Sequence, residues 1–484
     1  MGLRPSSTRP GQHPPAAVPG RIVILGAGPC GLACADQLTR LGHHDFLLLE
    51  AAEVPGGLAS SVVDAAGFTW DLGGHVVFSH FGEFDRLLDE LFAADELLHH
   101  DRSSFVRYSD RWVPYPFQRH LHHLPPAESA TCLRELLTLR QGTGTPGRAP
   151  VDFATWLAGM YGRTLVDRFF APYNTKVWAT RLEDMGSTWV AERVAPVDIE
   201  QVLAAFAGTA VPDCWGPNST FAFPARGGTG EIWRRLAARI GSDRLHTRSQ
   251  AIAIDPVGRT VALADGRLVR YDQLVATGPL NQLAAMTAAC PESLRAAAQG
   301  LRHTTVAMVG LGYRTPTSDE RSWLYFPQPD VPFYRATNFG KYAPANVPGA
   351  DTGAFSAWMT ETSIAPGKAL DEQALVHSCD QALRRHGLVP ERAPLVSAHI
   401  EVIPYAYPVP TLGRDEVLAQ VVPWFEKQGV YPRGRFGTWR YEIGNMDHAV
   451  KMGIDIAHRL AAGTPEELFT HATPMPATRV DCPS

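Results

Sequence analysis

The stretch RIVILGAGPCGLACADQL, residues 21–38, decides the fold of this chain. Apolar residues run into Gly26, Gly28 and Gly31, and an Ala- and Leu-rich segment follows. This order predicts a strand, a tight glycine turn and a helix whose N-terminus faces a pyrophosphate. Glu50 stands 19 positions after Gly31, at the end of the next apolar segment. A carboxylate there accepts hydrogen bonds from a ribose, so the sequence predicts a dinucleotide-binding unit.

Two further glycine-rich segments favour FAD over NAD as the dinucleotide. Gly56, Gly57 and Leu58 follow soon after Glu50. The long extended body of a flavin cofactor needs a second close approach of the backbone at this point. Near the end, YEIGNMDH places Gly444 and Asn445 before another predicted helix. The N-terminus of that helix is expected to meet the flavin end of the cofactor.

The charge and composition of the chain exclude several classes of partner. Of its 484 residues, 44 are Lys or Arg and 49 are Asp or Glu, which gives a net charge of −5. No basic surface for nucleic acid is therefore expected. No apolar run approaches the roughly 20 residues of a membrane span. The Pro- and Arg-rich first 20 residues lack the apolar centre of a signal peptide, so we expect a flexible tail and a cytoplasmic protein.

The cysteines and histidines give no metal-binding pattern. The seven cysteines are scattered and none forms a CxxC pair, which predicts a reducing compartment without a disulfide framework. Three histidine doublets stand in polar contexts, and they are His43–His44, His99–His100 and His122–His123. We expect them to be solvated surface groups, so the sequence predicts no metal site.

Alternating segments predict an α/β fold with two insertions. The first half is expected to contain a strand over 45–50, a helix over 81–98, a hairpin turning at 109–110, a link over 141–150 rich in Gly and Pro, and helices over 151–210. Short strands are expected from about 220, and a strand-rich part over 303–410. Residues 435–463 are expected to form a strand, a Gly–Asn turn and an amphipathic helix that ends at Gly463. A doubly wound core interrupted by a helical part and by an antiparallel sheet accounts for this order.

Nine longer motifs make the pattern more specific. They are DLGGHVVFSHFGEFD, RWVPYPFQ, PYNTKVWAT, AERVAP, WGPNSTFAFPARGGTGEIW, WLYFP, FYRAT, YPVPTL and GRFGTWRYEIGNMDH. In this order they resemble the UDP-galactopyranose mutase family, and specifically its eukaryotic-type branch. The resemblance covers about residues 21–463.

The resemblance implies a Rossmann-like FAD-binding domain with an inserted helical domain and an antiparallel β-sheet substrate domain. The implied boundaries are a tail over 1–20, an FAD-binding domain over 21–100, 219–282 and 412–465, a helical domain over 118–218, a substrate domain over 101–117 and 283–411, and a tail over 466–484.

The implied reaction is the ring contraction of UDP-galactopyranose to UDP-galactofuranose, an isomerisation without net oxidation. Reduced FAD acts in this family as the nucleophile at the anomeric carbon. NADPH is a possible reductant of the flavin. The sequence identifies neither the physiological reductant nor the oligomeric state, and the expected partner is a nucleotide sugar.

The resemblance also assigns roles to individual residues. Arg335 and Arg435 match the two arginines that hold the diphosphate, a task suited to guanidinium groups. His75, with Gly73 and Gly74, matches a loop against the flavin ring. The other matched residues bind substrate: Tyr325, Tyr342, Tyr407 and Tyr441 at the diphosphate, Tyr115, Phe117 and Gln118 at the uracil, Arg193 and Asn218 at the sugar, and Arg102, Asn174 and Trp178 along the site.

Three alternatives remain open on the sequence. The first is the same ring contraction on a GDP-sugar or a deoxy-sugar. The second is an FAD-dependent amine-type oxidase, which shares the glycine fingerprint but leaves two anion-binding arginines unexplained. The third is an FAD-binding protein without turnover.

Overall fold

A parallel five-stranded sheet forms the centre of the computed structural model, which describes residues 20–141, 152–190, 193–209, 216, 218–316 and 319–469. The strands lie in the order β19 (Val430–Pro432), β13 (Gln273–Ala276), β1 (Ile22–Leu25), β2 (Phe46–Leu49) and β9 (Leu245–His246). Every pairing is parallel. The expected strand–turn–helix is confirmed, because β1 leads directly into α1 (Pro29–Arg40).

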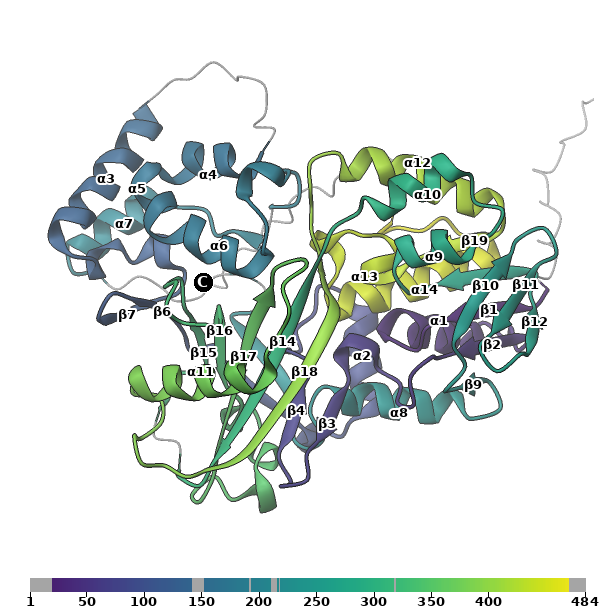
Figure 1. The fold of residues 1–484 in the computed structure, drawn as a ribbon, viewed down its shortest axis with the longest axis horizontal. Helices are drawn as coiled ribbons and strands as arrows, with labels where there is room; N and C mark the ends of the chain where they lie inside the picture. Colours follow the sequence, from purple (N-terminus) through teal and green to yellow (C-terminus); the bar gives the residue numbers. More distant parts are fainter. Residues whose placement is uncertain are drawn as a thin grey trace, which may run out of the picture.

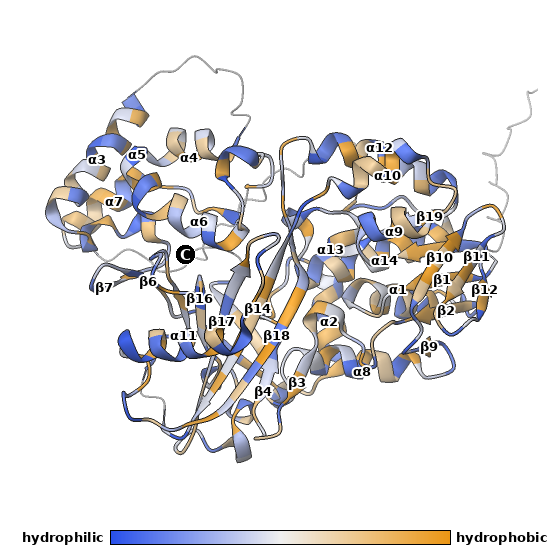
Figure 2. Cartoon of the chain, viewed as in Figure 1, coloured by the Kyte–Doolittle hydropathy of each residue, from blue (hydrophilic) through white to orange (hydrophobic). Residues whose placement is uncertain are grey.

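Helices cover both faces of this sheet (Figure 1). On one face, Ile22 and Ile24 pack with α1, α2 (Gly82–Leu91), α8 (Gly230–Ile240) and α14 (Met446–Ala462). On the other, Val23 packs with α9 (Leu280–Met286), α10 (Glu292–Gln299) and α12 (Arg414–Lys427). The strands are therefore apolar on both sides, as parallel strands between helices must be. Figure 2 shows this apolar colour on β1 and β2 beside the mixed colour of the helices.

A seven-stranded sheet carries much of the remaining chain. Its order is β18 (Leu395–Pro408), β14 (His303–Tyr313), β17 (Ser356–Ile364), β16 (Arg335–Asn338), β15 (Trp323–Tyr325), β6 (Ser104–Tyr108) and β7 (Arg111–Pro114). The pairings are antiparallel except that of β15 with β6. The hairpin expected at 109–110 is confirmed as the turn between β6 and β7. Helix α11 (Glu372–Arg385) packs on this sheet and was not expected.

Smaller elements complete the fold. A three-stranded sheet contains β10 (Ala251–Asp255), β11 (Thr260–Leu263) and β12 (Leu268–Arg270), and two pairs join β3 (Ser61–Val63) to β4 (Thr69–Asp71) and β5 (Leu97–Asp101) to β8 (Thr220–Pro224). The expected helical part contains α3 (Pro126–Gln141), α4 (Phe153–Tyr161), α5 (Arg163–Leu165), a π-helical turn (Val166–Phe170), α6 (Ala171–Trp178) and α7 (Ile199–Phe206). Figure 1 shows this helical part beside the edge of the seven-stranded sheet that ends in β7.

Two sequence expectations are wrong. The helix expected over 81–98 ends at Leu91, and Leu97–Asp101 instead pairs with β8, whose ladder of hydrogen bonds outweighs local helical spacing. The strand expected after residue 435 is replaced by α13 (Gly434–Gly437) and a 3₁₀ turn (Tyr441–Ile443). Left-handed backbone at Gly434 (φ 80°) and Trp439 (φ 52°) prevents an extended strand there. The terminal helix ends before Gly463 as expected.

Several expectations fall outside the described residues. They are the tail over 1–20 except its last residue, the link over 142–150, and the end of the chain from 470. The division into domains stays a prediction, although the FAD-binding segments supply the parallel sheet. Among the described residues, no helix combines the length and the apolar character needed to cross a membrane.

Helices α1 and α14 pack unusually closely at Gly453. A Cβ added there would lie 2.2 Å from the Cys30 carbonyl oxygen and 2.9 Å from the Cys34 nitrogen. We expect Gly453→Ala to destabilise the protein by about 1–3 kcal/mol, because backbone atoms must move apart. The midpoint of thermal unfolding measures this loss.

Gly159→Ala is the matched control. Gly159 lies within α4, and no heavy atom lies within 4 Å of an added Cβ. Alanine is expected to stabilise the protein by about 0.4–1 kcal/mol, because it reduces the conformational entropy of the unfolded chain. Equal midpoints for the two variants would contradict the close packing of α1 on α14.

Candidate active site

A cavity of about 820 Å³ lies where the parallel five-stranded sheet, the seven-stranded sheet and the helical part meet. The turn between β1 and α1 lines one region of it, together with the residues that follow β2 and β13. Strands of the seven-stranded sheet, α6 and the start of α14 line another. Pockets at the carboxyl ends of parallel strands commonly bind dinucleotides. The predicted residues that line this cavity are Gly26, Gly28, Glu50, Gly57, Leu58, Gly73, Gly74, His75, Arg102, Tyr115, Asn174, Trp178, Arg193, Asn218, Tyr325, Arg335, Tyr407, Arg435, Tyr441, Gly444 and Asn445.

The glycine turn is shaped to receive a dinucleotide. Gly28 precedes α1, and an added Cβ at Gly28 would meet no atom within 4 Å, so the backbone faces open cavity. A Cβ at Gly57 would lie 3.3 Å from Gly28 Cα, so the second glycine segment closes on the first. Unpaired N–H groups at the N-terminus of α1 attract phosphate. This cradle fits the pyrophosphate of FAD.

Glu50 hydrogen-bonds to the backbone of the same turn. Its carboxylate accepts hydrogen bonds from the Ala27 nitrogen (2.6 Å) and the Ala52 nitrogen (2.8 Å). It also lines the cavity, where it can accept a hydrogen bond from a ribose hydroxyl.

Gly31 and Gly56 lie outside the cavity lining and shape the cradle from behind. A Cβ at Gly31 would lie 1.9 Å from the Gly26 carbonyl oxygen, so this glycine allows α1 to pack against the turn. Gly56 has a φ of 118° and donates its N–H to the Ala27 carbonyl oxygen at 2.8 Å. This bond joins the two glycine segments.

The buried carboxylate of Glu361 connects the loop at residues 73–75 to Arg335. It accepts two hydrogen bonds from the Arg335 guanidinium, at 2.7 and 2.6 Å, and one from the Gly74 nitrogen at 2.8 Å. Arg335 and Glu361 are cross-strand partners on β16 and β17. Burial alone would raise the pKa of the Glu361 carboxyl, but the adjacent Arg335 charge and the Tyr334 hydroxyl lower it, so it is ionised.

Tyrosine hydroxyls continue this network. The Tyr334 hydroxyl donates to Glu361 at 2.7 Å and lies 3.3 Å from the Tyr407 hydroxyl. His75 lies in the same loop as Gly74, and burial and the nearby arginines lower its pKa to about 4, against the opposing pull of Glu361. His75 is therefore a neutral imidazole at neutral pH.

Arg435 faces the cavity without a carboxylate partner among the described residues. Its guanidinium donates to the carbonyl oxygens of Ala406 (3.1 Å) and Gly444 (2.8 Å) and lies over the Tyr407 and Tyr441 rings, 5.1 and 5.6 Å from their centroids. Burial lowers the pKa of Arg435, although the guanidinium stays charged at neutral pH. A buried cation held by neutral groups favours an anionic ligand.

Two more arginines line the cavity. Arg193 donates to the Asn445 side chain (3.0 Å) and the Glu442 carbonyl oxygen (2.7 Å), and it lies 5.2 Å from the centroid of Tyr441. Arg102 donates to the Asn218 side chain and lies 5.1 Å from the centroid of Tyr115. The aromatic rings thus orient the cations toward one region of the cavity.

Aromatic side chains enclose that region. Tyr115 and Tyr325 lie 5.0 Å apart between ring centroids, and Trp178 contacts both Tyr407 and Tyr441 edge-on. Asn174 also lines the cavity, and its amide donates to the Phe170 carbonyl oxygen. The surface offers flat faces for stacking together with hydroxyl donors.

Three predicted substrate residues lie outside the cavity lining. Phe117 is fully buried and stacks on Phe169. Gln118 is also buried and donates to the Ala195 carbonyl oxygen at 2.8 Å. Tyr342 packs against Phe221 and Phe223. In this structure the three side chains hold packed regions together, and a direct contact with substrate would need them to move.

Asp447 ties the N-terminus of α14 to the loop before α2. Its carboxylate accepts from the His80 backbone nitrogen at 3.0 Å, lies 2.6 Å from the His80 ring and contacts the His448 ring at 3.0 Å. Burial would raise the pKa of Asp447, but the two imidazoles lower it. The segment carrying Gly444 and Asn445 is thereby fixed beside the segment carrying His75.

Lys176 fixes the loop between β15 and β16. Its ammonium group lies 2.7–2.9 Å from four carbonyl oxygens, those of Phe326, Gln328, Val331 and Phe333. Lys176 is on α6, and the loop leads into Arg335, so this contact sets the helical part beside that arginine.

Sequence reasoning missed several lining residues: Tyr173, Trp189, Trp323, Tyr334, Glu361 and Asp447. For Glu361 a signal was present, since an acidic residue stands within the apolar strand SAWMTETSI. A buried acid requires a partner. Asp447 stands next to the predicted Gly444–Asn445 turn, where a helix N-terminus favours a carboxylate.

We expect Glu361→Gln to destabilise the free protein by about 3–5 kcal/mol, because Arg335 keeps its buried charge and loses its counter-ion. Thermal unfolding measures the change. Glu320→Gln is the control, since Glu320 pairs with Lys341 at an exposed site. It is expected to change stability by less than about 0.5 kcal/mol. A Glu361→Gln protein as stable as the control would contradict the bridging role of Glu361.

Comparisons with known proteins agree with this geometry. The family described as flavin containing amine oxidoreductase matches residues 29–460. A crystal structure of reduced UDP-galactopyranose mutase is similar over 95% of this chain and 97% of that one, with 36% identity and a TM-score of 0.89. This match agrees with the resemblance noted in the sequence.

Two more distant structures share the fold alone. Cyclohexylamine oxidase from Brevibacterium oxydans IH-35A is 18% identical over 92% of this chain and 99% of that one, with a TM-score of 0.64. A fatty acid isomerase from P. acnes is 15% identical over 91% and 98%, with a TM-score of 0.61. The same fold thus occurs in proteins named as oxidases and as isomerases.

Matches to curated proteins are short. Glutamate synthase (NADH) of Schizosaccharomyces pombe is 56% identical over 47 residues, and sarcosine oxidase subunit alpha of Corynebacterium sp. (strain P-1) is 32% identical over 135 residues. These cover 10% and 28% of this chain, which spans 2% and 13% of those proteins.

The family match and the mutase structure both imply FAD, for which the glycine cradle and Glu50 are suited. The α/β FAD-binding fold expected from the sequence is confirmed. The chain therefore belongs to the flavin containing amine oxidoreductase family, and it is similar to UDP-galactopyranose mutase along almost its whole length.

Proposed function

We propose that this flavin-dependent enzyme interconverts UDP-galactopyranose and UDP-galactofuranose. The observation that carries the proposal is the set of guanidinium groups on one cavity with the flavin cradle, namely Arg102, Arg193, Arg335 and Arg435. A nucleotide-sugar substrate brings two diphosphate charges into that region. The similarity to UDP-galactopyranose mutase supports the same substrate class.

The diphosphate is assigned to Arg335 and Arg435. Arg335 is pre-oriented by Glu361, which takes up two of its donors. Arg435 has carbonyl partners and a buried charge that an anion would balance. A hydrogen bond to a charged group contributes about 1.5–3 kcal/mol, so two such arginines can hold UDP while the sugar is attached elsewhere.

The remaining residues act on the sugar and its surroundings. When bound and reduced, FAD supplies the nucleophile for the anomeric carbon. The hydroxyls of Tyr407 and Tyr441 offer donors to the diphosphate, and Arg193 and Asn218 offer donors to the sugar hydroxyls. His75 is neutral, so it can donate one hydrogen bond and accept another beside the flavin without adding charge.

The uracil is assigned to the face of Tyr115. The ring lines the cavity beside Tyr325, and Arg102 lies over it. The proposed contacts of Phe117 and Gln118 with the base require the segment after Tyr115 to rearrange when substrate binds. Tyr342 is proposed to support the diphosphate site from the packed side rather than by direct contact.

The substrate assay tests the proposal directly. Purified holoenzyme is reduced with dithionite and given UDP-galactofuranose, and the products are separated by chromatography. We expect UDP-galactopyranose to form with reduced flavin and not with oxidised flavin, because only the reduced ring is nucleophilic at this position. NADPH in place of dithionite tests whether it serves as the reductant.

The assay also separates the alternatives. Turnover of a GDP-sugar or a deoxy-sugar instead would redirect the proposal to a sister mutase. Steady oxygen consumption with an amine, and no sugar product, would replace it with an oxidase. No turnover with any of these substrates would mean that the protein binds FAD without this chemistry.

Arg335→Ala and Arg435→Ala test the assigned diphosphate contacts. Each is expected to lower kcat/KM by roughly 10²–10³-fold, because a preorganised donor is lost from a site shielded from water. The flavin absorbance of purified Arg435→Ala is expected to stay unchanged. Arg335→Ala also leaves Glu361 without its counter-ion, so its thermal midpoint is measured beside its flavin content. Arg181→Ala is the control, since Arg181 is exposed and pairs with Glu183. Loss of bound flavin with either cavity variant would show that its arginine serves the cofactor instead.

A further inference from the structure

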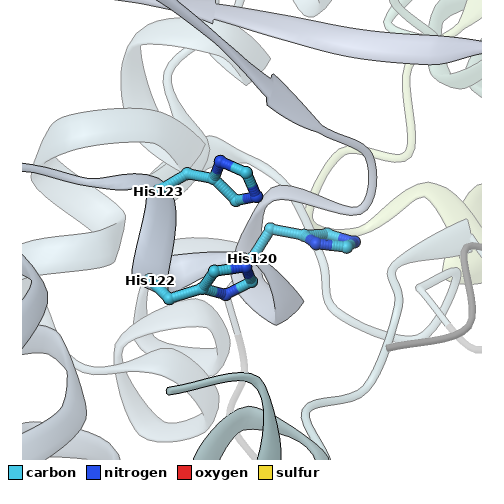
Figure 3. A group of neighbouring side chains, drawn as sticks. All are labelled: His120, His122 and His123. Atoms are coloured by element: carbon cyan, nitrogen blue, oxygen red, sulfur yellow. The ribbon is translucent and has the colours of Figure 1, made fainter. Parts of the chain in front are cut away.

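Three histidines gather on the segment between β7 and α3. His120 precedes a 3₁₀ turn over Leu121–His123, and His122 and His123 lie within it. One nitrogen from each ring can be chosen so that the three lie within 4.8 Å of one another. Ring centroids are 4.3 Å apart for His122 and His123, and 5.9 and 6.0 Å from His120 to each of them. Figure 3 shows the His122 and His123 rings near one another and the His120 ring to one side of them.

The backbone of this segment is well fixed. Two 3₁₀ turns follow one another, and residues three apart in such a turn share a face, which puts His120 and His123 together. The His123 nitrogen donates to the His120 carbonyl oxygen at 3.0 Å. The buried Leu121 accepts a hydrogen bond from the Ser129 hydroxyl through its carbonyl oxygen at 2.8 Å. These hydrogen bonds fix the backbone from which the three rings project.

We propose that His120, His122 and His123 bind one divalent transition-metal ion of the zinc, cobalt, nickel and copper group. Neutral imidazole nitrogens suit these ions, and three protein ligands leave a fourth position for water. His122 is exposed and His123 half-buried, so solvent reaches that position. Bonds of about 2.0–2.1 Å require ligand nitrogens no more than about 4.2 Å apart, so binding requires the exposed His122 ring and the half-buried His123 ring to turn toward His120.

The charges around the cluster permit this occupant. The Arg111 guanidinium donates to the His123 carbonyl oxygen at 3.0 Å, on the backbone side, and Asp110 lies beside it as a counter-ion. Arg119 is directed to the Pro196 carbonyl oxygen. The neutral form of each imidazole is the one that binds metal.

The site is separate from the proposed reaction. Within the described parts of the chain, the residues that line the cavity do not include these histidines. The sequence had indicated surface histidines at 122 and 123. The two 3₁₀ turns add His120 to this pair. A bound ion would join those turns and stabilise the start of the helical part.

Equilibrium dialysis of the untagged holoenzyme against Zn²⁺ tests the proposal, with Co²⁺ absorbance as a measure of coordination. We expect one high-affinity ion per chain and a cobalt spectrum typical of four-coordinate nitrogen and oxygen ligation. The double variant His122→Ala/His123→Ala is expected to bind Zn²⁺ at least roughly 10–100-fold more weakly. Loss of a residue that only hydrogen-bonds to a metal ligand already costs this much. Zn²⁺ is expected to raise the thermal midpoint of the wild type and not of the double variant.

His44→Ala is the matched control, because His44 is an exposed member of another doublet. It is expected to keep wild-type affinity. His122→Ala alone removes an exposed ring and is expected to fold normally, so weaker binding in it reports loss of a ligand. Equal binding by the wild type and the double variant, or no saturable site in the wild type, would overturn the proposal.

Discussion

The ion pair between Arg335 and Glu361 is the interaction on which the cavity depends. Glu361 reaches from β17 to a guanidinium on β16 and to the backbone nitrogen of Gly74, so one buried carboxylate connects the seven-stranded sheet to the loop at residues 73–75. A buried pair of this kind contributes little net stability when intact and costs much when broken. Its value here is orientation, because it fixes where the guanidinium points and how close the loop lies.

The charges in this cavity say more about its ligand than the fold does. The same fold occurs in proteins named as an amine oxidase and as an isomerase, so the fold alone does not identify the substrate. An amine is a cation and would be repelled by Arg193, Arg335 and Arg435. Of these three, Arg335 is the one that pairs with a carboxylate, that of Glu361, among the described residues. The guanidinium groups of Arg193 and Arg435, which have carbonyl and amide partners, favour an anionic ligand.

The sequence predicted the cradle well because its signals are local. Gly26, Gly28 and Glu50 lie within one strand–turn–helix–strand unit, and their spacing alone indicates their arrangement. Glu361 and Lys176 could not be predicted in this way, since each acts across a long sequence separation. The helix expected over 81–98 failed for the same reason, because its end pairs with a strand more than 100 residues away. Local spacing predicts local structure, and long-range pairing overrides it.

The segment after Tyr115 shows how packing changes the reading of a motif. RWVPYPFQ places Tyr115 on the cavity but turns Phe117 and Gln118 into the helical part, where they meet Phe169 and the Ala195 carbonyl oxygen. The helical part and the Tyr115 side of the cavity are therefore joined through the short segment 115–118. Any movement that brings Gln118 to a base must break its bond to Ala195 and shift the following turns. Under the proposed uracil assignment, binding on this side of the cavity would therefore be coupled to the position of the helices.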